Sequence, residues 1–212
     1  MDVSLAHEID AREMPAGWAS GYFGIFTRSP DEKPKPLYRT EVFHLNGALV
    51  TRAYQLSKQV SLSDSAAAQA YRARFPAAPA NQAPSVLRCD TVSSDTWFGG
   101  TLLAQRAGNW SALLTDGKAS YCTSQQEDNS TLEVLRRGQA AGKVDSERVL
   151  ILRAGSDVDR PPPGQSDSDV LLNYADQGGF GPSTANLVLT ARPVISEIVT
   201  HWARWKNAVP EY

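Results

Sequence analysis

The chain has 212 residues, a formal net charge of −2 and 42% hydrophobic residues, and its acidic and basic side chains are mixed along its length. This length suits one domain with a sizeable core. The small net charge provides no global basic field, so the composition does not indicate binding to nucleic acid or to an anionic membrane surface.

The first ten residues, Met1–Asp10, predict a strand, because they include the apolar residues Val3 and Leu5, two positions apart. Asp2 and Glu8 in the same stretch argue against a signal peptide. From Pro15 to Pro36 the chain is rich in glycine, proline and aromatic residues without a clear period, which predicts a long ordered loop.

Two helices are expected next. The segment Asn46–Val60 places its apolar residues on or near one helical face. A second helix is expected to be capped by Ser63 or Asp64 and to run through Phe75, before a connector over Ala77–Pro84.

Strands and helices then alternate. Val86–Cys89 and Val149–Ala154 are predicted strands, and the continuous apolar run of the second suits a buried central strand. Helices are expected near Gly100–Ala107 and Ser130–Ala141, and a last amphipathic helix is expected to start at Pro193. This alternation favours an α/β fold with a mixed central sheet flanked by helices.

Cysteine and histidine usage predicts no metal site. Cys89 and Cys122 can form one disulfide or remain two buried free thiols, and neither lies in a Cys-x-x-Cys cluster. His7, His44 and His201 are widely separated in the sequence. No stretch approaches the roughly 18 uninterrupted apolar residues of a membrane-spanning helix, so none is expected in this sequence.

Three polar clusters stand beside the predicted elements: Ser93–Gly100 and Gly155–Asp159 each follow a strand, and Gln125–Asn129 opens a helix. In open α/β sheets, ligands bind beyond the carboxyl ends of the strands. The residues alone leave two interpretations for each cluster.

Asp157 can cap the next turn or act on a ligand. Glu127 and Asp128 fit a solvated helix start or a binding role. Trp97 fits the core or a ligand platform.

Several runs of this sequence resemble those of the fungal-type purine nucleoside permease family. They are Glu8–Glu13, Gln126–Asn129, Arg153–Asp157, Arg160–Gln165 and Trp202–Trp205, and the resemblance covers nearly the whole chain. The pattern is also similar to nucleoside phosphorylases and methylthioadenosine nucleosidases through shorter matches. These matches are Ser94–Trp97, Glu127–Asp128 and Ser156–Asp157.

The resemblance implies roles for six residues. As catalytic residues, Asp157 would protonate a purine at N7, and Ser156 would orient Asp157. Glu127 or Asp128 would accept hydrogen bonds from the ribose hydroxyls. Trp97 would stack on the base while Phe98 lines the pocket.

The resemblance further implies that residues 1–212 form the C-terminal part of a single nucleoside phosphorylase-like domain. Family members are longer, and the N-terminal strands of the sheet would precede Met1, which suggests a truncated product or an incomplete gene model. No glycine-rich phosphate turn is visible before Asp10.

The function implied is purine nucleoside binding linked to nucleoside transmembrane transport and nucleoside metabolism. The alternatives are an enzyme that cleaves the N-glycosidic bond, as a phosphorylase or nucleosidase, and an inactive truncated fragment. No cofactor or metal is expected, with phosphate as the one candidate cosubstrate, and a homo-oligomer is suggested by analogy. The base and the compartment stay open, and the full-length family suits a cell-surface or exported context.

Overall fold

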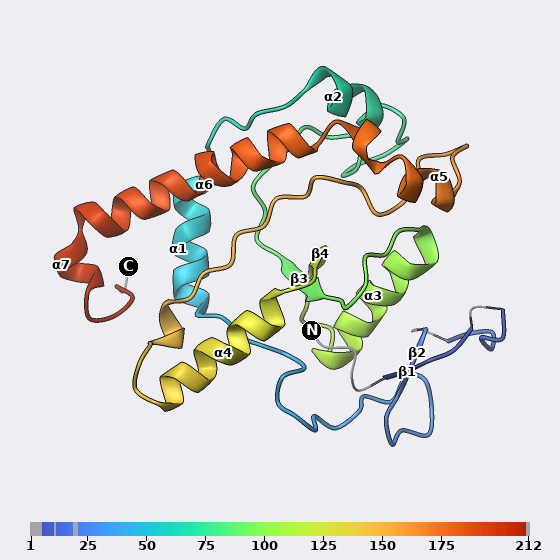
Figure 1. Ribbon diagram of the computed structural model, residues 1–212, viewed down its shortest axis with the longest axis horizontal. Coiled ribbons are helices and arrows are strands. Elements are labelled where there is room, and N and C mark those ends of the chain that lie inside the picture. The colour runs from blue at the N-terminus through green and yellow to red at the C-terminus, as the bar shows by residue number, and fades with distance from the viewer. Residues whose placement is uncertain (1–5, 11, 19–20, 211–212) are drawn as a thin grey trace. The chain divides into compact units, whose positions relative to one another are not determined.

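The computed structural model describes residues 6–10, 12–18 and 21–210, apart from the side chains of residues 6, 174 and 175 (Figure 1). The chain divides into two compact units, and each is built from two separate stretches of sequence. The first unit comprises Met1–His44 and Cys89–Val144, and the second comprises Leu45–Arg88 and Asp145–Tyr212.

The described residues of the first unit form short strands and two helices. In chain order its elements are β1 (Ala6–Glu8), β2 (Tyr22–Gly24), β3 (Asp90–Ser93), α3 (Thr101–Leu114), β4 (Tyr121–Gln125) and α4 (Asp128–Ala140).

The second unit contains helices and no strand among its described residues. Its elements are α1 (Gly47–Ser57), α2 (Ala66–Arg72), the 3-10 turn η1 (Ser146–Arg148), α5 (Asp167–Leu172), the 3-10 turn η2 (Tyr174–Gln177), α6 (Phe180–Thr200) and α7 (Trp202–Trp205).

The expected mixture of helices and strands is confirmed, but the single mixed central sheet is not observed among the described residues. They form two separate pairs: β1 with β2, antiparallel, and β3 with β4, parallel. The predicted central strand Val149–Ala154 is wrong, because this segment pairs with no strand of the described residues and Leu152 is 38% exposed. An apolar run becomes a strand only where a neighbouring strand completes its backbone hydrogen bonds.

The other strand predictions were partly correct. Of the described residues in the predicted N-terminal strand, 6–8 form β1, and residues 1–5 lie outside the described part. The strand expected at Val86–Cys89 was misplaced, because β3 begins at Asp90 and Leu87 is exposed. The predicted long loop contains the short strand β2, which pairs with β1.

The helices were better predicted than the strands, although several boundaries were wrong. Asn46 caps α1 by accepting from the amides of residues 48 and 49. The cap of α2 is Ser65 rather than Ser63 or Asp64, because the Ser65 hydroxyl accepts from the Ala68 amide. Helix α6 starts 13 residues before Pro193, which lies inside it.

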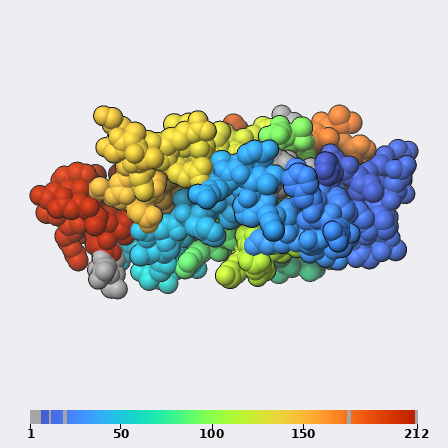
Figure 2. Space-filling model, turned by 90° about the horizontal axis from the view of Figure 1, so that it is seen from below, coloured from blue at the N-terminus to red at the C-terminus, as the bar shows by residue number. Residues whose placement is uncertain are grey.

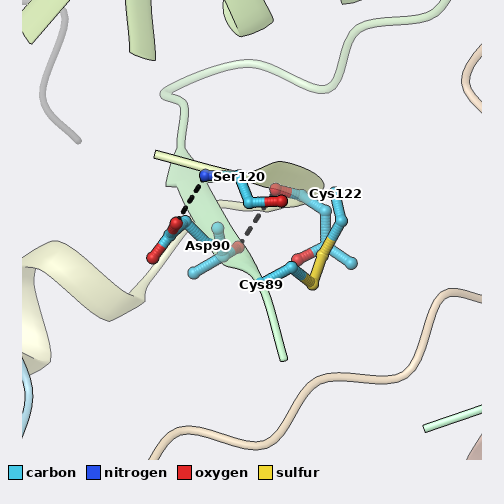
Figure 3. Close-up of a disulfide and its surroundings, with 6 residues drawn as sticks. Cys89, Asp90, Ser120 and Cys122 are labelled. Carbon is cyan, nitrogen blue, oxygen red and sulfur yellow. Dashed lines mark hydrogen bonds between the residues drawn. A yellow bond between two sulfur atoms is a disulfide. The ribbon is translucent and has the colours of Figure 1, made fainter. Parts of the chain in front are cut away.

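Cys89 and Cys122 form a disulfide with a Cα–Cα distance of 6.0 Å, so the alternative of two buried thiols is wrong (Figure 3). The bond lies beside the first rungs of the parallel pair β3–β4. There the Asp90 amide donates to the Ser120 carbonyl at 2.8 Å, and the Ser120 amide donates to the Asp90 carboxylate at 2.7 Å. The disulfide and these hydrogen bonds hold the beginnings of β3 and β4 together.

The core of the first unit is centred on α3. Trp110 is fully buried and packs with Leu114 against the half-buried Tyr22, Val42 and Leu113. The Tyr22 and Trp110 rings meet edge to face at 5.4 Å between centroids. This packing fixes β2 against α3.

Among the described residues, no helix is both long and apolar enough to span a bilayer. The same residues contain no group of three or more His, Cys, Asp and Glu side chains arranged to hold a metal ion.

Candidate functional site

A cavity of about 150 Å³ lies in the first unit. It is lined by β1, β2, the loop that follows β3, and the first two turns of α3. The polar and aromatic residues of the lining include Glu8, Tyr22, Ser94, Trp97, Phe98 and Arg106. The loop after β3 therefore stands where ligands are expected, beyond the carboxyl end of a parallel strand.

Two of the predicted binding residues, Trp97 and Phe98, lie together in this lining. Trp97 is 57% exposed and Phe98 is half-buried. The alternative that Trp97 belongs to the core is therefore wrong. A large aromatic ring that is left partly open beside a cavity is suited to stack on a planar ligand.

An ion pair that the sequence did not reveal forms the polar wall of the cavity. The Arg106 guanidinium donates to Glu8 at 2.9 Å, and its central carbon lies 4.4 Å from the centre of the Tyr22 ring. The Arg106 side chain is 15% exposed, whereas that of Glu8 is 67% exposed. Gly21 allows this packing, because a Cβ at this position would overlap the Arg106 side chain.

The environment of Tyr22 agrees with this arrangement. Burial raises the pKa of the Tyr22 phenol, while the positive charge of Arg106 partly opposes the rise. The phenol therefore stays neutral at physiological pH, so the cavity wall combines one ion pair with one neutral aromatic hydroxyl.

Glu127 and Asp128 open α4 and lie outside the cavity lining. The Gln125 side-chain oxygen accepts from the amides of both residues, at 2.7 and 2.8 Å. The Gln125 amide donates to the Ser93 hydroxyl at 2.5 Å, and that hydroxyl accepts from the Asn129 amide. Ser93 and Gln125, the last residues of β3 and β4, thus cap the helix in place of a carboxylate.

The two carboxylates have different surroundings. Glu127 is exposed, as expected of a solvated helix start, and accepts from the Gln126 amide at 2.9 Å. Asp128 is 9% exposed, so the solvated interpretation is wrong for this residue. Because Asp128 is the more buried of the two, its side chain has less freedom to move than that of Glu127. It is therefore better suited to bind a polar ligand group in a fixed position.

The predicted catalytic pair belongs to the second unit. The Ser156 hydroxyl donates to the Asp157 carboxylate at 2.6 Å, and both residues are half-buried. Among the described residues, no backbone amide donates to Asp157, so the structure does not show it capping the following turn. The serine instead holds the carboxylate in one orientation.

The backbone beside this pair is fixed by a buried glutamine that sequence reasoning missed. Gln177, at the end of η2, accepts from the Val158 amide at 2.6 Å and directs its own amide to the Val158 carbonyl at 3.4 Å. Gly179 follows closely, and a Cβ at this position would overlap the Ser156 carbonyl oxygen. The Gln-Gly-Gly run could have indicated a close backbone approach.

Tyr71 on α2 completes the surroundings of Asp157. Its hydroxyl is buried and has no hydrogen-bond partner within the described residues. Burial raises the pKa of the Tyr71 phenol most, the Arg74 guanidinium lowers it, and the Asp157 charge raises it. A neutral buried phenol that feels the Asp157 charge is a candidate hydrogen-bond donor for a bound ligand or for the acid itself.

Comparison with known proteins identifies the family to which the chain is related. The family model described as purine nucleoside permease (NUP) matches residues 1–210. A purine nucleoside permease of Candida albicans is 37% identical over 213 residues, which cover 100% of this chain and 52% of that protein. A probable purine nucleoside permease of Schizosaccharomyces pombe is 34% identical over 218 residues, which cover 97% of this chain and 61% of that protein.

The chain thus spans between half and two thirds of the length of these curated relatives. No solved structure matches it, so the likeness to nucleoside phosphorylases stays a prediction. The resemblance to the permeases is confirmed across almost every residue: the chain belongs to the purine nucleoside permease (NUP) family.

Proposed function

We propose that this chain binds purine nucleosides through the cavity of the first unit, as part of nucleoside transmembrane transport and nucleoside metabolism. The cavity wall formed by Trp97 and Phe98 carries the proposal. The names of the family and of the curated relatives supply the ligand class.

The size of the cavity favours recognition of the base. At about 150 Å³ it is smaller than the roughly 300–1,000 Å³ of pockets for drug-sized ligands. One planar ring system fits that space better than a whole nucleoside. The purine would stack on the exposed Trp97 ring, and the ribose would extend out of the cavity.

The polar wall adds selectivity for hydrogen-bond donors. Arg106 holds one oxygen of the Glu8 carboxylate, and the exposed carboxylate has capacity for further donors. The N–H groups on the edge of a purine base are suitable donors. Arg106 itself stacks on Tyr22, so the wall is held in place before a ligand arrives.

Binding is tested by titration calorimetry of the chain with adenosine, guanosine and inosine. Because stacking of a base on an aromatic side chain contributes about 1–3 kcal/mol, we expect Trp97→Ala to raise Kd about 5- to 150-fold. Phe180→Ala, at an exposed aromatic position of the second unit, is the control and should leave Kd unchanged. Equal affinities for Trp97→Ala and the parent chain would exclude the cavity as the binding site.

A second candidate function is cleavage of the N-glycosidic bond, and the hydrogen bond between Ser156 and Asp157 favours it. In this reaction Asp157 transfers its proton to N7 of the purine. The electron pair of the C1′–N9 bond moves into the base, and an oxygen of phosphate, or of a water molecule that releases one proton to solvent, forms the new bond to C1′. A nucleoside phosphorylase-like site of this kind needs a protonated Asp157 at the start of the step.

Cleavage is tested by chromatography of the free base released with and without phosphate. Asp157→Asn should abolish release while leaving the Kd for nucleoside within about twofold, because the amide keeps the shape of the carboxyl group but cannot supply its proton. Base release by Asp157→Asn at the parent rate would remove Asp157 from this role. Neither saturable binding nor base release by the parent chain would favour the third alternative, an inactive fragment.

We also propose that residues 1–212 form the C-terminal part of a single domain, which is consistent with curated relatives that are considerably longer than this chain. The intact mass of the native protein tests this proposal. A mass well above 23.0 kDa would support it, and a mass of 23.0 kDa would contradict it.

A further inference from the structure

Helix α6 buries several polar side chains and exposes three large apolar ones. Of the residues it buries, three are polar (Ser183, Asn186 and Thr190) and only Val194 is apolar. Val188, Ile195 and Val199 are instead 59%, 58% and 68% exposed. In an isolated globular unit, the apolar stripe of a helix normally faces the core.

Residues on the polar side of α6 form hydrogen bonds and an ion pair with other segments of the second unit. Asn186 accepts from the Ser63 amide at 2.7 Å and donates to the Ser63 carbonyl at 3.0 Å. The Thr190 carbonyl accepts from the Ser57 hydroxyl at 2.8 Å, and Glu197 pairs with Arg52 at 3.2 Å. These contacts fix α6 against α1 and the segment after it, so the helix cannot rotate to bury its apolar side (Figure 1).

The exposed apolar residues of α6 are aligned along one side of the helix. At 100° per residue, Val188, Ile195 and Val199 fall on the same side of the helix, opposite Asn186 and Thr190. With a rise of 1.5 Å per residue, the stripe extends about 16 Å along α6. Trp202, 57% exposed, follows on α7. Figure 2 shows the C-terminal part of the chain, in red, open at the molecular surface.

We propose that the stripe Val188–Ile195–Val199–Trp202 is a docking surface for the part of the NUP polypeptide that lies outside the matched segment. That part is 48% of the Candida albicans relative, since the matched region covers 52% of it. It is long enough to supply a further structural layer. Helices of α/β domains bury their stripes on a sheet, and the second unit has no strand among its described residues.

The charged residue Arg192 lies within the stripe, so the partner surface must provide a group that can accept its hydrogen bonds. Arg192 is exposed on the same side as Ile195, four residues after Val188. A guanidinium buried on docking requires an acceptor, so the docking segment should place a carboxylate or backbone carbonyl groups opposite Arg192. A purely apolar surface would not satisfy this condition.

The test is capture on co-expression. The complete 212-residue chain carries an affinity tag, and its partner is a separate polypeptide comprising the part of the Candida albicans permease outside the match. Val199→Asp introduces a charge into the stripe, and Val134→Asp introduces the same charge at an equally exposed position of α4, where Val134 is 67% exposed. Circular dichroism confirms that both variants fold.

The parent chain and Val134→Asp should capture the partner equally, and Val199→Asp should capture it at least about tenfold less, because a buried charge opposes docking. Failure of the parent chain to capture the partner would overturn the proposal, and so would equal capture by both variants.

Two other outcomes would also overturn it, because each would assign the stripe to a different occupant. One is self-association in sedimentation that Val199→Asp abolishes without any capture. The other is binding to phosphatidylcholine–phosphatidylserine vesicles that Val199→Asp likewise abolishes, again without capture of the partner. Nucleoside titration is measured separately, so the failure of this inference is distinguishable from the failure of the proposed function.

Discussion

The two units of this chain are stabilised in different ways. In the first, α3 buries Trp110 and Leu114 against half-buried aromatic and aliphatic neighbours. In the second, the longest helix buries Asn186 and Thr190 and exposes valine and isoleucine. The first unit thus gathers its buried apolar side chains in a cluster on α3, whereas the second unit combines buried apolar side chains such as Leu49 and Trp205 with directional polar contacts along α6.

The largest expected effect is at the core of the first unit. Trp110→Ala should lower the free energy of unfolding by about 3–5 kcal/mol, because it leaves a large cavity around a fully buried ring. Urea unfolding followed by circular dichroism measures the loss. Trp202→Ala, at a ring that is 57% exposed, should cost less than about 0.5 kcal/mol. Similar losses for the two variants would contradict the assignment of the core to α3.

A smaller effect is expected at the polar contacts of the second unit. Asn186→Ala leaves the amide and the carbonyl of Ser63 without their partner, and the free energy of unfolding should fall by about 1–3 kcal/mol. The same urea titration applies, with Asn207→Ala, at an exposed position of the second unit, as the control. An unchanged midpoint for Asn186→Ala would mean that polar contacts do not support this unit.

The smallest effect depends on pH. The Arg72 guanidinium binds the Asp64 carboxylate at 3.0 and 2.6 Å and holds the pKa of Asp64 below its ordinary value of 3.8. Because this pKa is lowered on folding, the ion pair contributes stability above the ordinary pKa, and the contribution is lost as pH falls through the lowered value.

Asp64→Asn should therefore be less stable than the parent chain at neutral pH, and the difference should disappear in acid. Thermal unfolding between pH 2 and 7 measures it, with Asp95→Asn as the exposed control. A difference that persists at the lowest pH would show that Asp64 acts through something other than its charge.

The sequence predicted helices better than strands, and the reason is physical. The start of α3 and the extent of α4 follow from local periodicity and from the glycines that bound them, Gly100 and Gly142, both at positive φ. Val149–Ala154 has an apolar sequence that is equally typical of a strand. A strand also requires a neighbouring strand as its partner, and the described residues supply none. The early start of α6 was missed because Pro193 was read as a first-turn proline, although it is accommodated in the helix interior.

The candidate site was predictable only where its residues lie close together in the sequence. Trp97 and Phe98 follow a strand directly, so a sequence pattern could place them. Glu8 and Arg106 are 98 residues apart and form an ion pair only in the folded chain, and no short motif records such a pair. The Gln177 contacts with Val158 were missed for the same reason, since they join residues 19 positions apart.

The Cys89–Cys122 bond closes a covalent ring of polypeptide with a sequence separation of 33 residues. The ring contains Trp97, Phe98 and Arg106, so most of the cavity wall identified above is tethered even in an unfolded chain. A single proteolytic cut within the ring would open it without releasing either fragment until the disulfide is reduced. The cavity wall and both ends of α3 therefore remain within reach of one another during refolding, because the tether removes much of the entropy of closing that loop.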